Sequence, residues 1–293
     1  HNKIVSVMKS FADYKKDAPN QITMANGAFY PDILAQACEL YKPVLVYFGQ
    51  LIRISPSSEH LLKEITKLTQ TWMRIQLLRV FRKYVSPDTS VEMLKSKNNI
   101  PMVCKTFGKD FRAINLVQKK FNERPLPDEA LCAILWEYKD RGQKGYSLTE
   151  SFFEMFQSKF PSYSIEGPKR AGADIQLSSV FVDYPNPSRP VDFVIRDEHK
   201  NVLAIGLARY DSDRGGAQED DRTGGYNNCA KEILSYTTKH NLKTKVIFLN
   251  DGPGLLLGSM WDDYAKLEKL DNRIMVLTLR MVNERLTKKW FNE

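Results

Sequence analysis

The sequence predicts a mixed α/β protein, with a helical region over residues 1–140 and an α/β domain over residues 141–293. In the first region, apolar residues recur at steps of three and four, as they do on one face of an amphipathic helix. After Gly142 the pattern changes to short runs rich in branched and aromatic residues, which are typical of strands. The order expected in the second region is helix, strand, strand, strand, helix, strand. That order indicates a mixed central sheet flanked by helices.

Composition narrows the classes of function. The chain has 293 residues, of which 42% are hydrophobic, enough for one large or two modest domains with real cores. It carries 43 Lys and Arg against 35 Asp and Glu, a net charge of +8. This excess favours a polyanionic partner, although an ordinary basic soluble protein is the alternative. Four isolated cysteines predict reduced thiols in a cytoplasmic protein and no structural zinc site. No apolar run is long enough for a membrane span, so no membrane partner is expected.

The first region contains one long amphipathic run, over residues 57–84, that Ser57 and Ser58 can cap at its start. Near its end, Arg79, Arg82 and Lys83 share one face. This face is either an ordinary solvated surface or a strip that contacts DNA phosphates. Two further basic helices are predicted before Gly142.

The second region begins with a helix over residues 147–160, where Ser147 and Glu150 have the spacing of a capping box. A second helix is expected over residues 227–240. The run at 272–282 is interpreted as either a strand or the start of a closing helix. The predicted strands cover residues 173–184, 190–197, 201–210 and 244–251.

A dense charged segment follows the third of these strands. Residues 208–226, ARYDSDRGGAQEDDRTGGY, contain eight charged side chains and four glycines. So many carboxylates close together cost free energy unless cations share the site, which makes Asp211 and Glu219 candidate metal ligands. The alternative is a network of surface salt bridges that fixes a loop.

Basic and amide side chains of the same segment suit contacts with nucleic acid. Arg209, Arg214 and Arg222 are expected to face phosphates or guanine edges. Gln218 has the geometry for a bidentate contact with adenine. The segment also opens the second helix, whose first amides could bind a phosphate.

Residues 142–254 resemble the core of the PD-(D/E)XK nucleases, and most of all type II restriction endonucleases, including those that cut at GATC. The resemblance rests on the helix with Glu150, the VDFVI strand that Asp192 opens, the next strand with its polar exit, and the LNDGPG run at 249–254. It implies a restriction-endonuclease-like core and Mg²⁺-dependent hydrolysis of double-stranded DNA by a homodimer. It also implies that Asp192 is catalytic and binds the metal, and that Glu150 supports the site.

The sequence departs from the family pattern on the second motif strand, where Gly206 and Ala208 stand at the positions of the acid and the lysine. Three interpretations remain open. The functions have moved to the strand exit, where Asp211 or Glu219 would join Asp192 at the metal and Arg209 would be the catalytic cation. The chain has been inactivated by substitution, or it is a DNA-binding relative without catalysis. A repair or RNA-processing nuclease is a further alternative.

Overall fold

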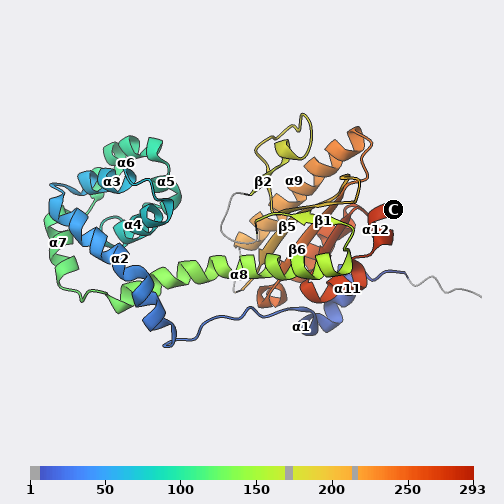
Figure 1. The fold of residues 1–293 in the computed structure, drawn as a ribbon, viewed down its shortest axis with the longest axis horizontal. Coiled ribbons are helices and arrows are strands. Elements are labelled where there is room, and N and C mark those ends of the chain that lie inside the picture. The colour runs from blue at the N-terminus through green and yellow to red at the C-terminus, as the bar shows by residue number, and fades with distance from the viewer. Residues whose placement is uncertain (1–6, 169–173, 213–216) are drawn as a thin grey trace, which may run out of the picture. The chain divides into compact units, whose positions relative to one another are not determined.

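The computed structural model describes residues 7–168, 174–212 and 217–293, without the side chains of residues 140–142, 145–146 and 217–222. It forms two compact units. Residues 27–141 make a helical unit, and the chain up to Asn26 together with residues 142–293 makes a sheet unit. The long helix α8 (Glu129–Lys159) contributes its first part to the helical unit and its second part to the sheet unit (Figure 1).

The N-terminal segment was expected to belong to the helical region, but it packs in the sheet unit. Phe11, in the 3-10 helix η1 (Phe11–Asp17), stacks on Trp261 with 4.3 Å between ring centroids. The Trp261 indole Nε1 also donates a hydrogen bond to the Phe11 carbonyl at 3.0 Å. Farther along, Arg285 Nε donates to the Lys9 carbonyl at 3.0 Å. The two pairs are 250 and 276 positions apart in the sequence, so no local pattern reveals them.

The helical unit is built from shorter helices than the sequence predicts. The run over 57–84 is broken at residues 67–70, where Gln70 accepts a hydrogen bond from Met73 N and starts a new helix. The expected cap is confirmed, because the Ser57 side chain accepts from His60 N at 3.0 Å. The helices that precede α8 in this unit are α2 (Ile33–Ile54), α3 (Ser58–Thr66), α4 (Thr71–Tyr84), α5 (Val91–Lys95), α6 (Ile100–Phe107) and α7 (Ile114–Asn122). Of the helices in the described part of the chain, none has the length and apolarity that a membrane crossing demands.

Helix α8 also corrects a predicted boundary. It runs without a break through Gly142, so Ser147 and Glu150 lie inside a helix and do not form a capping box at its start. Its second part buries an apolar face that includes Leu148, Phe152 and Phe156. Spacings of four residues keep these side chains on one side of the helix.

The central sheet has five strands in the order β1-β4-β5-β6-β7. Neighbours from β1 to β5 are antiparallel, and neighbours from β5 to β7 are parallel. Helix α9 (Ala217–Lys239) connects β5 to β6, and α10 (Met260–Lys269) connects β6 to β7. If only the strands of the central sheet are counted, the order from α8 to β6 is helix, strand, strand, strand, helix, strand, but the first of these strands is β1 and not the run predicted at 173–184. The strands are β1 (Ser164–Glu166), β4 (Phe193–Arg196), β5 (Val202–Tyr210), β6 (Lys245–Asp251) and β7 (Ile274–Leu277).

Two strand predictions were wrong in detail. The run at 173–184 holds only β2 (Ile175–Gln176), which pairs with β3 (Pro190–Val191) in a separate two-stranded sheet. The first strand of the main sheet is instead β1, which the sequence did not indicate. It is three residues long, too short to show an alternating pattern. The run at 272–282 contains the strand β7.

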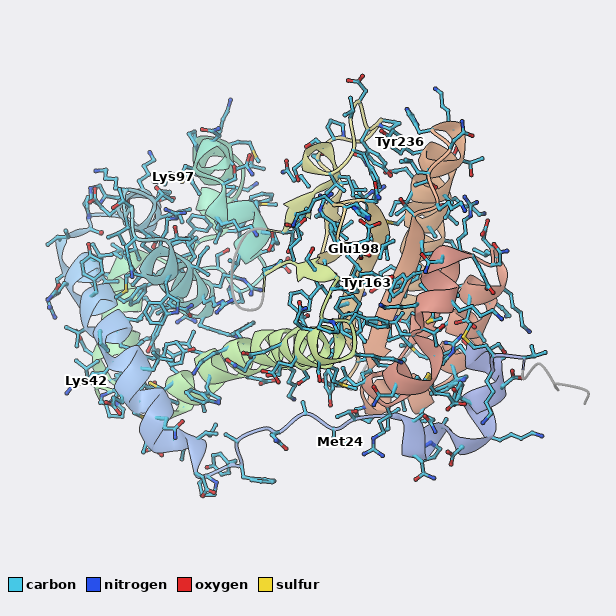
Figure 2. The ribbon with its side chains drawn as sticks, turned by 45° about the vertical axis from the view of Figure 1, so that its right-hand side comes forward. Met24, Lys42, Lys97, Tyr163, Glu198 and Tyr236 are labelled. Carbon is cyan, nitrogen blue, oxygen red and sulfur yellow. The ribbon has the colours of Figure 1, made fainter. Side chains whose placement is uncertain are left out.

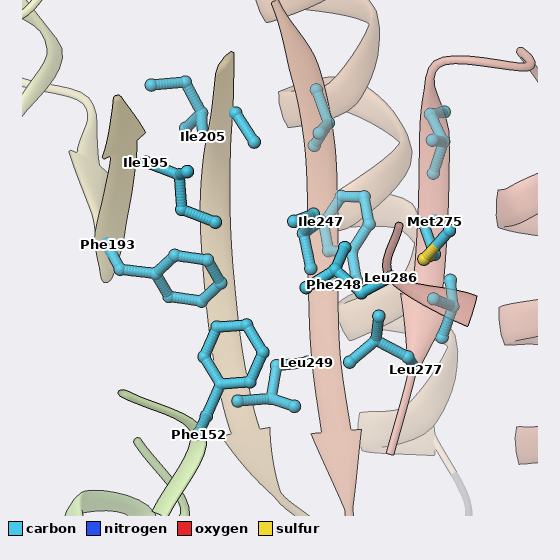
Figure 3. Packing of buried hydrophobic residues seen from close by; sticks show 14 of the residues in the cluster. Phe152, Phe193, Ile195, Ile205, Ile247, Phe248, Leu249, Met275, Leu277 and Leu286 are labelled. Atoms are coloured by element: carbon cyan, nitrogen blue, oxygen red, sulfur yellow. The ribbon is translucent and has the colours of Figure 1, made fainter. Parts of the chain in front are cut away.

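Helices cover both faces of the sheet. On one face, Phe152 of α8 packs on Phe193 of β4, with ring centroids 5.0 Å apart (Figure 3). On the other, Tyr226 of α9 packs on Phe248 of β6, with centroids 4.7 Å apart. The charged segment over residues 208–226 includes the carboxyl end of β5 and the start of α9.

Candidate active site

Asp192 lies at a bend between β3 and β4, where β5 holds it through two backbone contacts. Its amide donates to the Gly206 carbonyl at 2.9 Å, and its carboxylate Oδ2 accepts from Ala208 N at 2.7 Å. Burial raises the pKa of Asp192 to about 6. The Ala208 hydrogen bond opposes this shift, Asp174 adds to it, and the positive charge of Arg209 opposes it. A partly buried carboxylate with a raised pKa is a common feature of functional sites.

Arg209 provides the positive charge beside Asp192. Arg209 is partly buried, and its guanidinium has no hydrogen bond or ion pair with any residue in the described ranges. In the parallel pairing of β5 with β6, Arg209 stands opposite Asn250. Asp174, directly before β2, adds a negative charge to the same neighbourhood.

Gly206 is explained by packing. A Cβ atom added to it would overlap with the ring of Phe193, its partner across the β4–β5 pair. Its side-chain position therefore faces Phe193, and alternation places Leu207 and Arg209 on the opposite face of β5. The glycine makes room for a buried aromatic ring, which argues against the interpretation that a catalytic acid at this position was substituted.

We expect Gly206→Glu to leave DNA cleavage no higher than in the wild type. Gly206→Ala should lower the free energy of unfolding by roughly 3 kcal/mol, because the added atom overpacks the core. Urea unfolding and a plasmid-cleavage assay measure the two effects. Gly224→Ala is the matched control: nothing lies within 4 Å of its added Cβ, and the position is helical. That variant should gain about 0.5–1 kcal/mol. Sharply raised cleavage by Gly206→Glu would restore the inactivation hypothesis.

Asp211 is held inside the sheet unit. It is 1% exposed, its amide donates to the Asp251 carbonyl at 2.7 Å, and its carboxylate Oδ2 accepts from the Tyr264 hydroxyl at 3.3 Å. It is three residues beyond Ala208, about 10 Å in an extended strand. Asp211 is not among the charges that shift the pKa of Asp192. The structure thus places it against Tyr264, and its role as a metal ligand stays a prediction.

The other predicted residues of the nuclease core are placed as follows. Glu150 is partly buried within α8, and it too is absent from the charges that act on Asp192. The start of α9 at Ala217 agrees with the helix expected to open in this segment. The side chains of Gln218, Glu219 and Arg222, and the whole of Arg214, lie outside the described residues, so their predicted roles stand as predictions.

The basic face predicted in the helical unit is partly engaged in internal contacts. The Arg79 guanidinium lies 4.8 Å from the ring centroid of Tyr138, and its Nη1 donates to Gln76 at 3.2 Å. Arg82 donates to the Pro87 carbonyl at 2.9 Å. Lys83 is exposed. Arg79 and Arg82 therefore have structural contacts in this unit, whereas Lys83 presents its charge to solvent.

Asn250 is the residue of this region that the sequence analysis missed. Its side chain is fully buried on β6, and neither its Oδ1 nor its Nδ2 has a hydrogen-bond partner among the described residues. Within the same part of the chain, the Oδ1 atom of Asn227, on α9, is also buried without a partner. Leaving a buried polar group unpaired costs about 1–3 kcal/mol. The signal in the sequence that could have identified Asn250 was an amide directly after the apolar run VIFL of β6.

Asp251 has a structural role at the same end of the sheet. Burial raises its pKa, and three backbone amides oppose that shift. Oδ1 accepts from Thr23 N at 2.6 Å and Gly252 N at 2.7 Å, and Oδ2 accepts from Leu279 N at 3.0 Å. The segment that contains Met24, which Figure 2 labels, is thereby bonded through Thr23 to the carboxyl end of β6. Beside it is a pocket of about 210 Å³.

Oxygen donors around Asp192 fit a hard cation. Among the described residues, no three His, Cys, Asp or Glu side chains gather closely enough to hold a metal ion alone. Mg²⁺ does not need such a group, because proteins bind it through one or two carboxylates, substrate phosphates and retained waters. The partly buried Asp192 carboxylate and the unpaired Asn250 oxygen are donors of this kind.

No protein-family model matches the sequence, and neither the curated proteins nor the solved structures include a significant match.

Proposed function

We propose that the protein is a Mg²⁺-dependent endonuclease that hydrolyses phosphodiester bonds of double-stranded DNA, as type II restriction enzymes do. The observation that carries this proposal is the position of Asp192. It lies directly before β4, bonded to β5 and beside Arg209, in a mixed sheet flanked by helices. The raised pKa of its carboxyl group supports a functional role.

Asp192, the Ala208 amide and Arg209 would each have a separate role in the reaction. Bound Mg²⁺ would polarise the scissile phosphate and lower the pKa of a water molecule. The Asp192 carboxylate would hold the cation, and the Ala208 amide fixes the orientation of that carboxylate. Because the proton must leave Asp192 before metal binds, cleavage should fall below pH 6. Arg209 would bind phosphate oxygens and stabilise the negative charge that develops on them.

The partner in this proposal is double-stranded DNA, in keeping with the net charge of +8. A homodimer is proposed as well, since a two-fold axis in the protein would match a palindromic site. The cytoplasm is the proposed location, where the four cysteines would stay reduced.

A specific observation favours a second candidate, a DNA-binding protein of the same fold without catalysis. None of Gly206, Leu207 and Ala208 on β5 carries a carboxylate or a lysine. Both candidates bind DNA, so cleavage separates them. Supercoiled plasmid incubated with Mg²⁺, and separately with EDTA, should be cut at discrete sites only with Mg²⁺. Binding without cleavage would support the second candidate, and cleavage without discrete sites would indicate a repair-type nuclease.

Binding of DNA is expected to weaken steeply with salt. Each neutralised phosphate contributes about −0.9 to the slope of log K against log salt concentration. Fluorescence anisotropy with a labelled duplex between 50 and 300 mM KCl, roughly the range over which such slopes are resolved, measures the effect. A flat response would show that the positive charge serves solubility and not a DNA surface.

A further inference from the structure

Asn250 occupies a position where an apolar residue is expected. It follows a fully buried run in β6, and its side chain points to the same face as Phe248, two residues earlier. That face is covered by α9, since Tyr226 packs on Phe248. The Asn250 amide is thus fully buried, and both of its polar atoms are unpaired among the residues that the structure describes. An apolar side chain of the same volume would avoid the cost of burying unpaired polar atoms, so the amide indicates a ligand.

Asn250 is also close to the candidate active site. It is the register partner of Arg209, which directly follows Ala208, and the Ala208 amide donates to Asp192 Oδ2 at 2.7 Å. Asp192 precedes Phe193, which pairs with Gly206, so it lies level with Leu207 and Phe248, two residues before Asn250. The backbones at Asp192 and Asn250 are therefore roughly 12 Å apart, a span that the two side chains can bridge through a common cation or a water bound to it.

We propose that Asn250 is a second ligand of the divalent cation that Asp192 holds, through its carboxamide oxygen, directly or by way of a metal-bound water. The inference rests on the proposed Mg²⁺ dependence. A neutral oxygen suits the place, because Mg²⁺ accepts amide oxygens as well as carboxylates. A second carboxylate there would repel Asp192 whenever the metal is absent.

Mg²⁺ alone, without DNA, is the probe. Thermal unfolding of the wild type should shift upward as Mg²⁺ is added, and isothermal titration should give a dissociation constant. Asn250→Leu should melt at a higher temperature than the wild type without metal, because it removes two unpaired atoms. Its dissociation constant for Mg²⁺ should rise by about tenfold or more. Thr244→Val is the matched control, since Thr244 is a buried polar residue just before β6 whose hydroxyl already donates to the Val202 carbonyl. This variant should keep the Mg²⁺ response.

Asn250→Asp provides an independent readout if the leucine variant does not fold. It keeps the shape and adds a charge, so it should bind Mg²⁺ about tenfold more tightly than the wild type. Wild-type Mg²⁺ affinity in Asn250→Leu or Asn250→Asp would overturn the inference and leave the proposed function intact. A wild type that neither responds to Mg²⁺ nor cuts DNA would overturn the proposed function, and this inference with it.

Discussion

Replacing Asp192 with asparagine is expected to abolish DNA cleavage while making the folded protein more stable at neutral pH. The amide keeps the size of the side chain but loses the charge that would hold Mg²⁺, so cleavage should fall by about a thousandfold or more. DNA binding should remain or tighten, because a negative charge near the phosphate is removed. A cleavage assay and an anisotropy titration on the same preparation measure both effects.

The gain in stability should depend on pH. The pKa of Asp192 is raised from 3.8 to about 6 by burial, so between these values the folded protein binds more protons than the unfolded chain. The free energy of unfolding therefore falls as pH rises from about 4 to 6, by at most about 3 kcal/mol. Asp192→Asn removes this loss of stability. The free energy of unfolding of the variant should exceed that of the wild type by almost nothing at pH 4 and by the most above pH 6, as measured by urea unfolding.

Asp174→Asn is the control for this experiment. It removes a neighbouring negative charge that helps to raise the pKa of Asp192. Cleavage should therefore persist, and the pH at which cleavage falls off on the acidic side should be lower than in the wild type. Near-wild-type cleavage by Asp192→Asn would refute the assignment of the active site. If Asp192→Asn is inactive but shows the same pH dependence of stability as the wild type, the raised pKa of Asp192 is refuted instead.

Replacing Asp251 with alanine is expected to cause the largest loss of stability, at least about 3 kcal/mol. The change would leave three backbone amides, those of Thr23, Gly252 and Leu279, without their acceptor at a buried site. Each such orphan costs about 1–3 kcal/mol. The N-terminal segment would also lose a bond to the strand ends. Urea unfolding, with limited proteolysis near residue 24, measures both consequences.

Asp262→Ala serves as the control, because it removes a carboxylate from an exposed ion pair with Lys15 at 2.7 Å. Exposed pairs contribute about 0–1 kcal/mol, so that variant should unfold close to the wild type. If Asp251→Ala lost as little stability as Asp262→Ala, Asp251 would behave as an ordinary surface acid in solution. Unchanged proteolysis in Asp251→Ala would show that other bonds fix the N-terminal segment.

Local sequence patterns were sufficient for two strands of the central sheet. Short apolar runs rich in branched residues predict β5 and β6 within one residue of their observed ends. The change of pattern near Gly142 falls at the boundary between the helical unit and the sheet unit. Asp192 was singled out by the resemblance of residues 142–254 to PD-(D/E)XK nucleases. The strand and boundary predictions depend only on residues close together in the chain.

Other features depend on contacts between distant segments. Continuity of α8 through Gly142 overrides the local breaker, because its second part buries a face against the sheet. Gly206 resembles a lost catalytic acid in the sequence, and only the ring of Phe193 explains it. The unpaired amide of Asn250 is invisible until β6 is seen to be enclosed.

The sequence by itself thus determined the class of fold, the order of its main elements and the acid around which the candidate site is built. The tertiary structure decided that the N-terminal segment belongs to the sheet unit, that Arg209 and Asn250 stand together, and that Asp211 faces Tyr264. The physical reason is the range of the interactions. Periodicity and turn chemistry act over a few residues, whereas burial, strand register and the pKa of a carboxyl group are set by side chains that only folding brings together.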